Sequence, residues 1–242
     1  MTRTEAFAAN FRSDGLRVGT FLKTPAPELV EILALSGLDF ICIDAEHAPF
    51  GRREIDLCLG MARAVDLPAL VRVASSESAP ILQALDGGAV GILAPHVASA
   101  SHAARVSRWA RFGPDGRGYS GSTRSAGYSI GPKVGEVVVV AQIEDTGGVE
   151  EVEAIAATDG IDALFFGAAD LAKAYNVDAG DDSIKQARER IRSACSTSRK
   201  PFAFFAKSQS TLAAHREAGE GGLAIVSSDQ GLLLAGARSV IS

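Results

Sequence analysis

Cysteine is scarce in this chain, which has only 3 among its 242 residues. Cys42, Cys58 and Cys195 show no Cys-x-x-Cys spacing, and two of them lie in apolar or helix-like segments. Zinc sites usually bring cysteines together in closely spaced sets, and reactive thiols need an environment that favours the thiolate. The pattern therefore predicts reduced cysteines that fill the interior, rather than a zinc site or a catalytic thiol.

Clustered positive charge is also missing. The chain has 24 Lys and Arg against 29 Asp and Glu, a net charge of −5, and its basic residues are scattered. Because nucleic-acid binding needs a basic patch, we expect no nucleic-acid partner. Residues 1–15 lack the apolar core of a signal peptide, and no apolar run is long enough to span a bilayer. The sequence therefore predicts a cytoplasmic protein without a membrane partner.

The chain does contain many short apolar runs. With 47% hydrophobic residues it can form a large core, and we expect a single domain over residues 1–242. Strands that are apolar throughout are typical of parallel sheets covered by helices. Eight such runs alternate with helix-like segments, at residues 17–22, 40–44, 68–73, 90–95, 137–144, 163–168, 202–206 and 223–227. The alternation predicts a (β/α)8 TIM barrel. An open doubly wound sheet is the alternative, disfavoured because no GxGxxG follows the first run.

Two segments fall outside this alternation. Residues 4–15 predict an extra helix at the bottom of the barrel, ahead of the first strand. Residues 113–136 form a long, glycine-rich connection. Because long irregular loops in compact domains are usually functional, we expect a functional role for this one.

Polar side chains follow several of the predicted strands. In TIM barrels the carboxyl ends of the strands form the catalytic mouth, so residues far apart in sequence would meet there. The residues concerned are Asp44, Glu46 and His47 after the second run, Arg72 in the third, Pro95 and His96 after the fourth, Gln142 and Glu144 in the fifth, and Asp170 after the sixth. The charges are tolerated, on this interpretation, because they face a polar cavity.

Glu144 and Asp170 are candidate metal ligands. Two carboxylates on neighbouring strands suit a hard divalent ion such as Mg²⁺ or Mn²⁺ better than Zn²⁺, which prefers nitrogen and sulfur ligands. The alternative is helix capping, by Asp170 at the segment DLAKAY and by Glu144 or Asp145 at the helix that follows the fifth strand.

Arg72 lies in an apolar run, where a charged side chain predicts contact with an anion at the mouth. The alternative is an internal ion pair with Asp44 or Glu46. His47 follows both carboxylates closely, so one of them could orient its imidazole as a general base, and the alternative is a structural or capping histidine. His96 is ambiguous between these roles.

Seven segments in order resemble the HpcH/HpaI family of class II pyruvate-dependent aldolases, from about residue 15 to residue 237. They are IDAEHAPF, LVRV, ALDGGAVGILAPHVASA, RGYSGSTRSAGY, AQIED, GIDALFFGAADLA and IVSSDQGLLLAGA. The resemblance implies a TIM barrel that binds a divalent cation (Mg²⁺ or Mn²⁺, with Co²⁺ as a further option) through Glu144 and Asp170. It places Gln142 beside this metal, and the backbone amides of Ala169 and Asp170 at the substrate carboxylate.

The resemblance also implies a reaction. A 4-hydroxy-2-oxo acid, of the 4-hydroxy-2-oxoheptanedioate or 2-dehydro-3-deoxyglucarate type, would be cleaved reversibly to pyruvate and an aldehyde, in aromatic or sugar acid catabolism. His47 and Asp44 would act together as the base, and Arg72 would steady the enolate with the metal. Relatives are commonly homo-oligomers, trimers or hexamers, and the resemblance implies that Asp86 and the loop from Arg117 to Tyr128, including Arg124, would contribute to a neighbour's site.

Some features depart from the family pattern or leave the function open. Ala168 and Ala169 replace the usual Gly-Pro context of the metal aspartate, so the loop is less rigid. Cations and hydroxyls expected near the mouth favour an acidic aldehyde; they are Arg117, Arg124, Tyr128, Lys173 and Tyr175. Three alternatives to the metal aldolase are a Schiff-base aldolase using Lys207, a citrate-lyase-type enzyme acting on a CoA ester, and a noncatalytic barrel that binds a 2-oxo acid.

Overall fold

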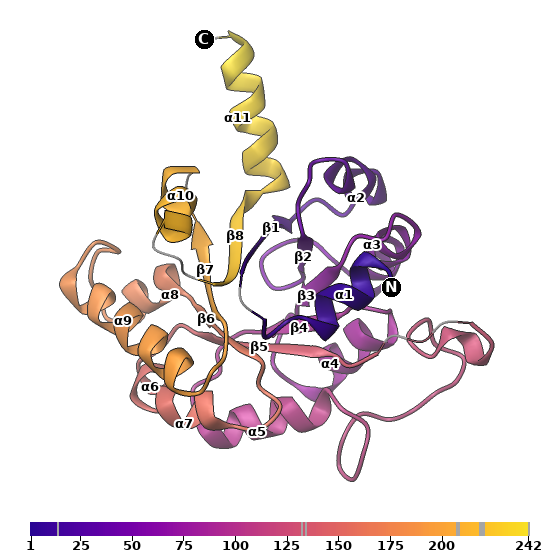
Figure 1. The fold of residues 1–242 in the computed structure, drawn as a ribbon, viewed down its shortest axis with the longest axis horizontal. Helices are drawn as coiled ribbons and strands as arrows, with labels where there is room; N and C mark the ends of the chain where they lie inside the picture. Colours follow the sequence, from indigo (N-terminus) through magenta and orange to yellow (C-terminus); the bar gives the residue numbers. More distant parts are fainter. Residues whose placement is uncertain (14, 132, 134, 207–208, 218–220, 242) are drawn as a thin grey trace.

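The computed structural model describes residues 1–13, 15–131, 133, 135–206, 209–217 and 221–241. Eight parallel strands pair in chain order and close into a barrel, with helices around it (Figure 1). The strands are β1 Leu16–Leu22, β2 Phe40–Asp44, β3 Ala69–Arg72, β4 Gly91–Ala94, β5 Val138–Ile143, β6 Ala163–Phe166, β7 Phe202–Ala206 and β8 Gly222–Ser228. The predicted (β/α)8 TIM barrel is confirmed.

Helices connect the strands, and most of them cover the outside of the barrel. They are α1 Arg3–Ala9, α2 Pro27–Ala34, α3 Arg52–Ala64, α4 Ser78–Asp86, α5 Ala100–Trp109, α6 Thr146–Glu150, α7 Val152–Ala157, α8 Ala168–Ala174, α9 Asp182–Thr197, α10 Gln209–Glu217 and α11 Asp229–Ile241. The extra helix expected before the first strand is α1. Its N-terminus has a capping box in which Thr2 and Glu5 exchange hydrogen bonds with each other's backbone. Among the described residues, no helix is both long enough and apolar enough to cross a bilayer.

Aromatic side chains fill the lower part of the barrel. Phe7 of α1 and Phe40 of β2 lie with ring centroids 5.5 Å apart, so α1 plugs the end at which the strands begin. Gly19 of β1 leaves space for Phe40, because a Cβ at residue 19 would come within 2.6 Å of that ring. The interior is therefore a packed core, and the polar residues are left to the opposite end.

All three cysteines are buried and free, as the sequence predicts. Burial raises the pKa of Cys42 to about 12, that of Cys58 to about 11 and that of Cys195 to about 12. The thiols are therefore neutral at physiological pH and unsuited to nucleophilic or metal-binding roles.

The last helix, α11, stands away from the barrel (Figure 1). It begins at Asp229, directly after β8 ends at Ser228, so no loop is present to turn it back onto the barrel wall. Asp229 is buried, and its carboxylate accepts hydrogen bonds from the backbone amides of Lys23 (2.6 Å) and Thr24 (3.1 Å). The base of α11 is thus anchored to the segment that follows β1.

Candidate active site

A buried ion pair lies between the ends of β2 and β3. Asp44 and Arg72 are register partners on these strands. The Arg72 guanidinium donates from Nε to Asp44 Oδ1 (2.9 Å) and from Nη2 to Asp44 Oδ2 (2.7 Å). Burial alone would raise the pKa of Asp44, but the hydrogen bonds and charge of Arg72, with smaller help from the His47 amide and Lys23, lower this pKa to about 2. Asp44 is therefore a permanent anion at neutral pH.

Arg72 is held on several sides. Its guanidinium carbon lies 4.5 Å from the centroid of the Phe21 ring, and its Nε lies 3.4 Å from Glu46 Oε2. The ion pair with Asp44 or Glu46, which the sequence left open as an alternative, is thus present. The two hydrogen bonds to Asp44 are donated by Nε and Nη2 of Arg72. Nη1 is therefore the guanidinium nitrogen left for an anion at the mouth.

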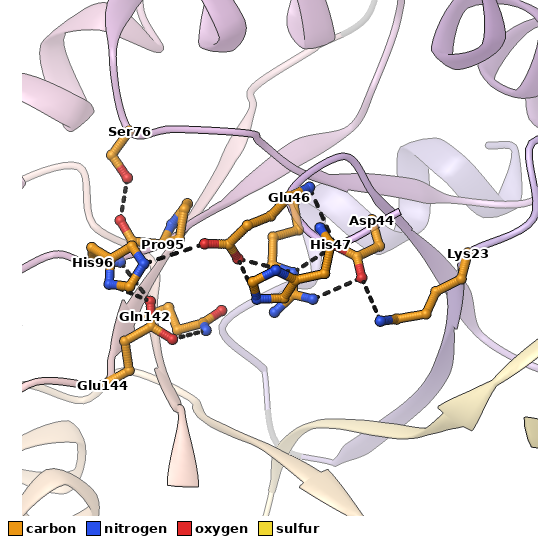
Figure 2. A network of polar contacts seen from close by, with 10 residues as sticks. Lys23, Asp44, Glu46, His47, Ser76, Pro95, His96, Gln142 and Glu144 are labelled. Carbon is orange, nitrogen blue, oxygen red and sulfur yellow. Dashed lines mark hydrogen bonds and ion pairs between the residues drawn. The ribbon is translucent and has the colours of Figure 1, made fainter. Parts of the chain in front are cut away.

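Two carboxylates and one imidazole converge beside this pair. Ligand atoms of Glu46, His96 and Glu144 all lie within 4.8 Å of one another. His96 Nε2 lies 3.3 Å from Glu46 Oε1, and His96 Nδ1 lies 3.2 Å from Glu144 Oε1 (Figure 2). The His96 backbone has a positive φ of 54° and its amide donates to Glu144 Oε1 (2.7 Å), which brings its ring over this carboxylate.

This cluster fits a cation. The pKa of the Glu144 carboxyl is raised, and burial is the largest cause. This is expected for a buried carboxylate that has too little positive charge beside it. Glu46 Oε2 and Gln142 Oε1 are buried and accept no hydrogen bond from the described residues. Gln142 Nε2 donates to Glu144 Oε2. The carboxylate oxygens suit a divalent ion of the Mg²⁺ or Mn²⁺ type, whereas the imidazole suits a transition-metal ion.

His47 lies at the edge of the same network. Its backbone amide donates to Asp44 Oδ1 (3.1 Å), while its imidazole Nε2 lies 3.6 Å from Glu46 Oε2 and half of its side chain is exposed (Figure 2). The carboxylate beside the imidazole is therefore Glu46, since Asp44 is occupied by Arg72 and by Lys23, whose Nζ lies 3.0 Å from Asp44 Oδ2.

Known proteins share this architecture. Residues 17–232 match the family described as HpcH/HpaI aldolase/citrate lyase. This chain belongs to that family. It is accordingly an aldolase, a carbon–carbon lyase, and the family is dependent on a divalent metal.

Individual relatives differ in their substrates. The chain is 34% identical over 215 residues to a hydroxypyruvate/pyruvate aldolase of Paraburkholderia phytofirmans. The matched region covers 83% of each chain. It is 37% identical over 180 residues to a 4-hydroxy-2-oxovalerate aldolase of Novosphingobium aromaticivorans, covering 71% of this chain and 68% of the relative. A crystal structure of a HpcH/HpaI aldolase/citrate lyase family protein from Burkholderia cenocepacia J2315 superposes with a TM-score of 0.91 at 32% identity, covering 98% of each chain.

The second expected metal ligand of this aldolase is not part of the Glu46–His96–Glu144 group. Asp170 is in the first turn of α8, just beyond the end of β6, and does not belong to the group of Glu46, His96 and Glu144. It does not cap this helix, because the N-cap is Gly167. Gly167 allows β6 and β5 to approach closely, since a Cβ there would lie 2.5 Å from Glu144 Cβ. Ligation by Asp170, and substrate contacts by Gln142 and by the Ala169 and Asp170 amides, stay predictions.

The glycine-rich loop lies at the other end of this barrel. It runs from α5 to β5, so it borders the beginnings of the strands rather than the mouth. Arg124 Nη1 binds Asp56 Oδ1 (2.7 Å) and the carbonyl of Gly87 (2.6 Å), and the carbonyl of Asp86 accepts from the Ser125 amide (3.2 Å). Arg124 therefore lies at the end of its own barrel opposite to the mouth, and the expectation that Arg117, Arg124 and Tyr128 lie near a mouth stays a prediction. A role for Asp86, Arg117 and Arg124 in a neighbour's site stays a prediction.

Three residues of the site were undervalued or missed in the sequence. The sequence placed Glu46 and His96 after their strands but did not predict that they belong to one cation-binding group. Their positions directly after β2 and β4 were the feature that could have indicated this. Lys23 follows β1 at the same end and was missed. Lys207, the candidate for a Schiff base, lies outside the described residues.

Proposed function

We propose that this aldolase cleaves a 4-hydroxy-2-oxo acid reversibly to pyruvate and an aldehyde. The observation that carries the proposal is the juxtaposition of the Glu46–His96–Glu144 group with Arg72, whose Nε lies 3.4 Å from Glu46 Oε2. Retro-aldol cleavage needs a base at the C4 hydroxyl and positive charge at the keto oxygen, where negative charge develops. The names of the relatives, hydroxypyruvate/pyruvate aldolase and 4-hydroxy-2-oxovalerate aldolase, agree with a substrate of this kind.

Glu144 is the residue we propose as the main metal ligand. It is shared by the two possible ligand sets, one with Asp170, which the family resemblance implies, and one with Glu46 and His96, whose ligand atoms lie within 4.8 Å. When bound there, a divalent ion supplies Lewis acidity at the keto oxygen of the 2-oxo acid. Mg²⁺ or Mn²⁺ suits the oxygen-rich donors, and Co²⁺ would accept the imidazole as well.

The chain's own residues perform the remaining tasks in this proposal. Arg72 directs Nη1 at the developing negative charge, and the Asp44 carboxylate holds its guanidinium in place through two hydrogen bonds of 2.9 and 2.7 Å. His47 takes the proton from the C4 hydroxyl, because its half-exposed imidazole can reach a substrate and is steadied by Glu46 at 3.6 Å. In this proposal the Asp44 carboxylate positions the Arg72 guanidinium and not the His47 ring.

The test is exchange of the pyruvate methyl protons for deuterium, followed by NMR with and without Mg²⁺ or Mn²⁺. This exchange reports formation of the enolate and needs no knowledge of the aldehyde. We expect exchange that depends on metal and is abolished by EDTA and in Glu144→Ala, while Glu189→Ala on the surface of α9 retains it. Absence of exchange with every divalent ion would overturn the proposal and favour a CoA-ester lyase or a noncatalytic barrel.

Metal titrations identify the second ligand. We expect Glu144→Gln to weaken Mn²⁺ binding at least tenfold in either ligand set, measured by calorimetry. A comparable loss in Asp170→Asn but not in His96→Ala assigns the carboxylate pair, and the opposite result assigns the cluster. Unchanged binding in Glu144→Gln would remove the metal site from this part of the mouth.

We also propose that the protein is a homo-oligomer. Leu233, Val240 and Ile241 on the projecting α11 are 75%, 84% and 86% exposed, and Ile32 and Leu35 on α2 are 61% and 90% exposed. Because α11 projects from the barrel, a second copy would be able to cover these apolar side chains. Light scattering should give a mass of at least two chains, and Leu233→Asp combined with Ile241→Asp should lower it. A monomer at micromolar concentration would refute this.

A further inference from the structure

The end of β8 carries a bulge on the side that pairs with β1. Between the pairs that it forms with Gly19 and with Phe21, β8 contains one residue more than β1. Within this stretch Ser227 has a positive φ of 56°, which is uncommon for a residue other than glycine. Bulges are frequent beside active sites, where they redirect the chain and the side chains that follow. The chain that follows here is the start of α11, at Asp229.

Asp229 anchors the segment after β1. Its two carboxylate oxygens accept hydrogen bonds from the backbone amides of Lys23 (2.6 Å) and Thr24 (3.1 Å), and only 7% of the residue is exposed. A buried carboxylate is costly unless hydrogen bonds satisfy it, so a change in the position of these amides would be unfavourable. The backbone of Lys23 is therefore held by the junction of β8 and α11 as well as by its own strand.

From this position the Lys23 side chain reaches the ion pair between β2 and β3 (Figure 2). Its Nζ lies 3.0 Å from Asp44 Oδ2, the oxygen that also accepts from Arg72 Nη2 at 2.7 Å. The other oxygen, Oδ1, accepts from Arg72 Nε (2.9 Å) and from the backbone amides of Glu46 (3.3 Å) and His47 (3.1 Å). The backbone thus holds one oxygen of the Asp44 carboxylate, and Lys23 holds the other.

Arg72 has a second carboxylate within reach. Its Nε lies 3.4 Å from Glu46 Oε2, a buried oxygen that accepts no hydrogen bond from the described residues. The charges of Lys23 and Arg72 are balanced by those of Asp44 and Glu46, so the contribution of Lys23 is orientation and not the attraction of a further anion. If the Asp44 carboxylate were free to turn, the guanidinium could rotate towards Glu46 and lose the direction of Nη1.

We propose that Lys23 is a positioning residue of this enzyme. It locks the plane of the Asp44 carboxylate, and Asp44 in turn keeps the Arg72 guanidinium aimed at the keto oxygen of the substrate. Asp229 supports this role from α11 by fixing the Lys23 backbone. The inference rests on the proposed aldol reaction, in which Arg72 meets the developing negative charge. It adds to that reaction two residues that do not touch the substrate.

The experiment measures kcat for deuterium exchange into pyruvate and, separately, Mn²⁺ affinity by calorimetry, at a temperature at which every variant is folded. Lys23→Met keeps the length of the side chain and removes its charge-assisted hydrogen bond. We expect this loss to lower kcat by about 10- to 100-fold. Mn²⁺ affinity should stay unchanged, because the Glu46–His96–Glu144 group is intact. Lys23→Arg should restore most of the rate.

The variant Lys23→Cys provides a stricter test. The native cysteines are buried, so a thiol reagent should modify this variant at residue 23 alone. Alkylation with 2-bromoethylamine rebuilds a side chain of lysine length that ends in an ammonium group. Iodoacetamide adds a neutral amide of the same length. We expect the ammonium to restore exchange and the amide to leave it low.

Asp229→Asn tests the anchor. It should lower kcat in the wild type, and because Asp229 acts through Lys23, its effect should be much smaller in the Lys23→Met background. The matched control is Asp66→Asn. Asp66 also accepts two successive backbone amides, those of Arg3 (2.7 Å) and Thr4 (3.1 Å), but it does so beside α1 at the other end of the barrel. This control should leave the rate of exchange unchanged.

Three results would contradict the inference. If Lys23→Met exchanges pyruvate protons as fast as the wild type, or if the neutral amide restores the rate as well as the ammonium does, Lys23 does not position Arg72. If Asp66→Asn lowers kcat as strongly as Asp229→Asn, the effect reflects stability in general. Absence of exchange in the wild type rejects the proposed reaction and the inference with it, whereas exchange that persists in Lys23→Met rejects the role of Lys23 alone.

Discussion

Replacing Asp44 with asparagine tests how strongly the buried ion pair holds the mouth together. The Asp44 and Arg72 side chains are 0% and 8% exposed. Asparagine keeps the shape of the side chain but leaves the guanidinium and the nearby Lys23 ammonium facing a neutral amide. Removing one partner of a buried pair costs ~3–5 kcal/mol. For a chain of this size ~1 kcal/mol shifts the melting temperature by about 2–4 °C, so we expect a fall of about 6–20 °C.

Thermal and urea unfolding at a fixed protein concentration provide the assay. The double variant Asp44→Asn with Arg72→Met removes both charges, so it should be more stable than the sum of the single changes predicts, by more than ~1 kcal/mol. Asp182→Asn is the matched control, because its pair with Lys185 is solvent-exposed and its loss should leave the melting temperature unchanged. Strict additivity, or a melting temperature of Asp44→Asn equal to the wild type, would refute the reasoning.

Further predictions concern the cysteines and the glycines. Because the pKa values of the cysteine thiols are raised to about 11 or 12, a thiol reagent at pH 8 should label none of them in the native protein within minutes, and all 3 after denaturation; rapid native labelling would contradict their burial. Gly222 has a φ of +127°, and a Cβ there would lie 2.0 Å from the Phe202 carbonyl oxygen. Gly222→Ala should therefore lower the free energy of unfolding by about 2–5 kcal/mol in urea titrations. Gly236→Ala on α11 meets no atom within 4 Å and should raise it by about 0.5–1 kcal/mol, so equal effects of the two changes would be inconsistent with this account.

The barrel could be predicted because each strand has a local signature. Every one of the eight apolar runs coincides with a strand within a few residues, from Phe40–Asp44, where the bounds agree, to Ala163–Phe166, where the run extends two residues too far. The position of the 113–136 loop was not predicted, because length and glycine content suggest function without indicating which end of the barrel the loop occupies. Its position between a helix and the following strand was the better guide, since such connections lie at the beginnings of the strands.

The site was harder to predict than the barrel because its contacts depend on register and backbone conformation. Asp44 pairs with Arg72 rather than with the His47 ring because β2 and β3 align residues 44 and 72. His96 reaches Glu144 through a positive φ of 54°, which no feature of the sequence indicates. Lys23 was missed because a single lysine after a strand has no distinguishing pattern until the burial of Asp44 is known.

The mouth of this barrel is divided between two sets of strands. Glu46, His96 and Glu144 follow β2, β4 and β5, whereas a cavity of about 350 Å³ is lined largely by residues of β1, β7 and β8. Arg72 of β3 lines this cavity and also lies beside Glu46. A change in the strands around this cavity can alter the shape or charge offered to a substrate without moving the groups that would hold a metal. A barrel arranged in this way can acquire new partners for a constant nucleophile through few substitutions, and directed evolution of this enzyme could begin at Phe205 and Ser227.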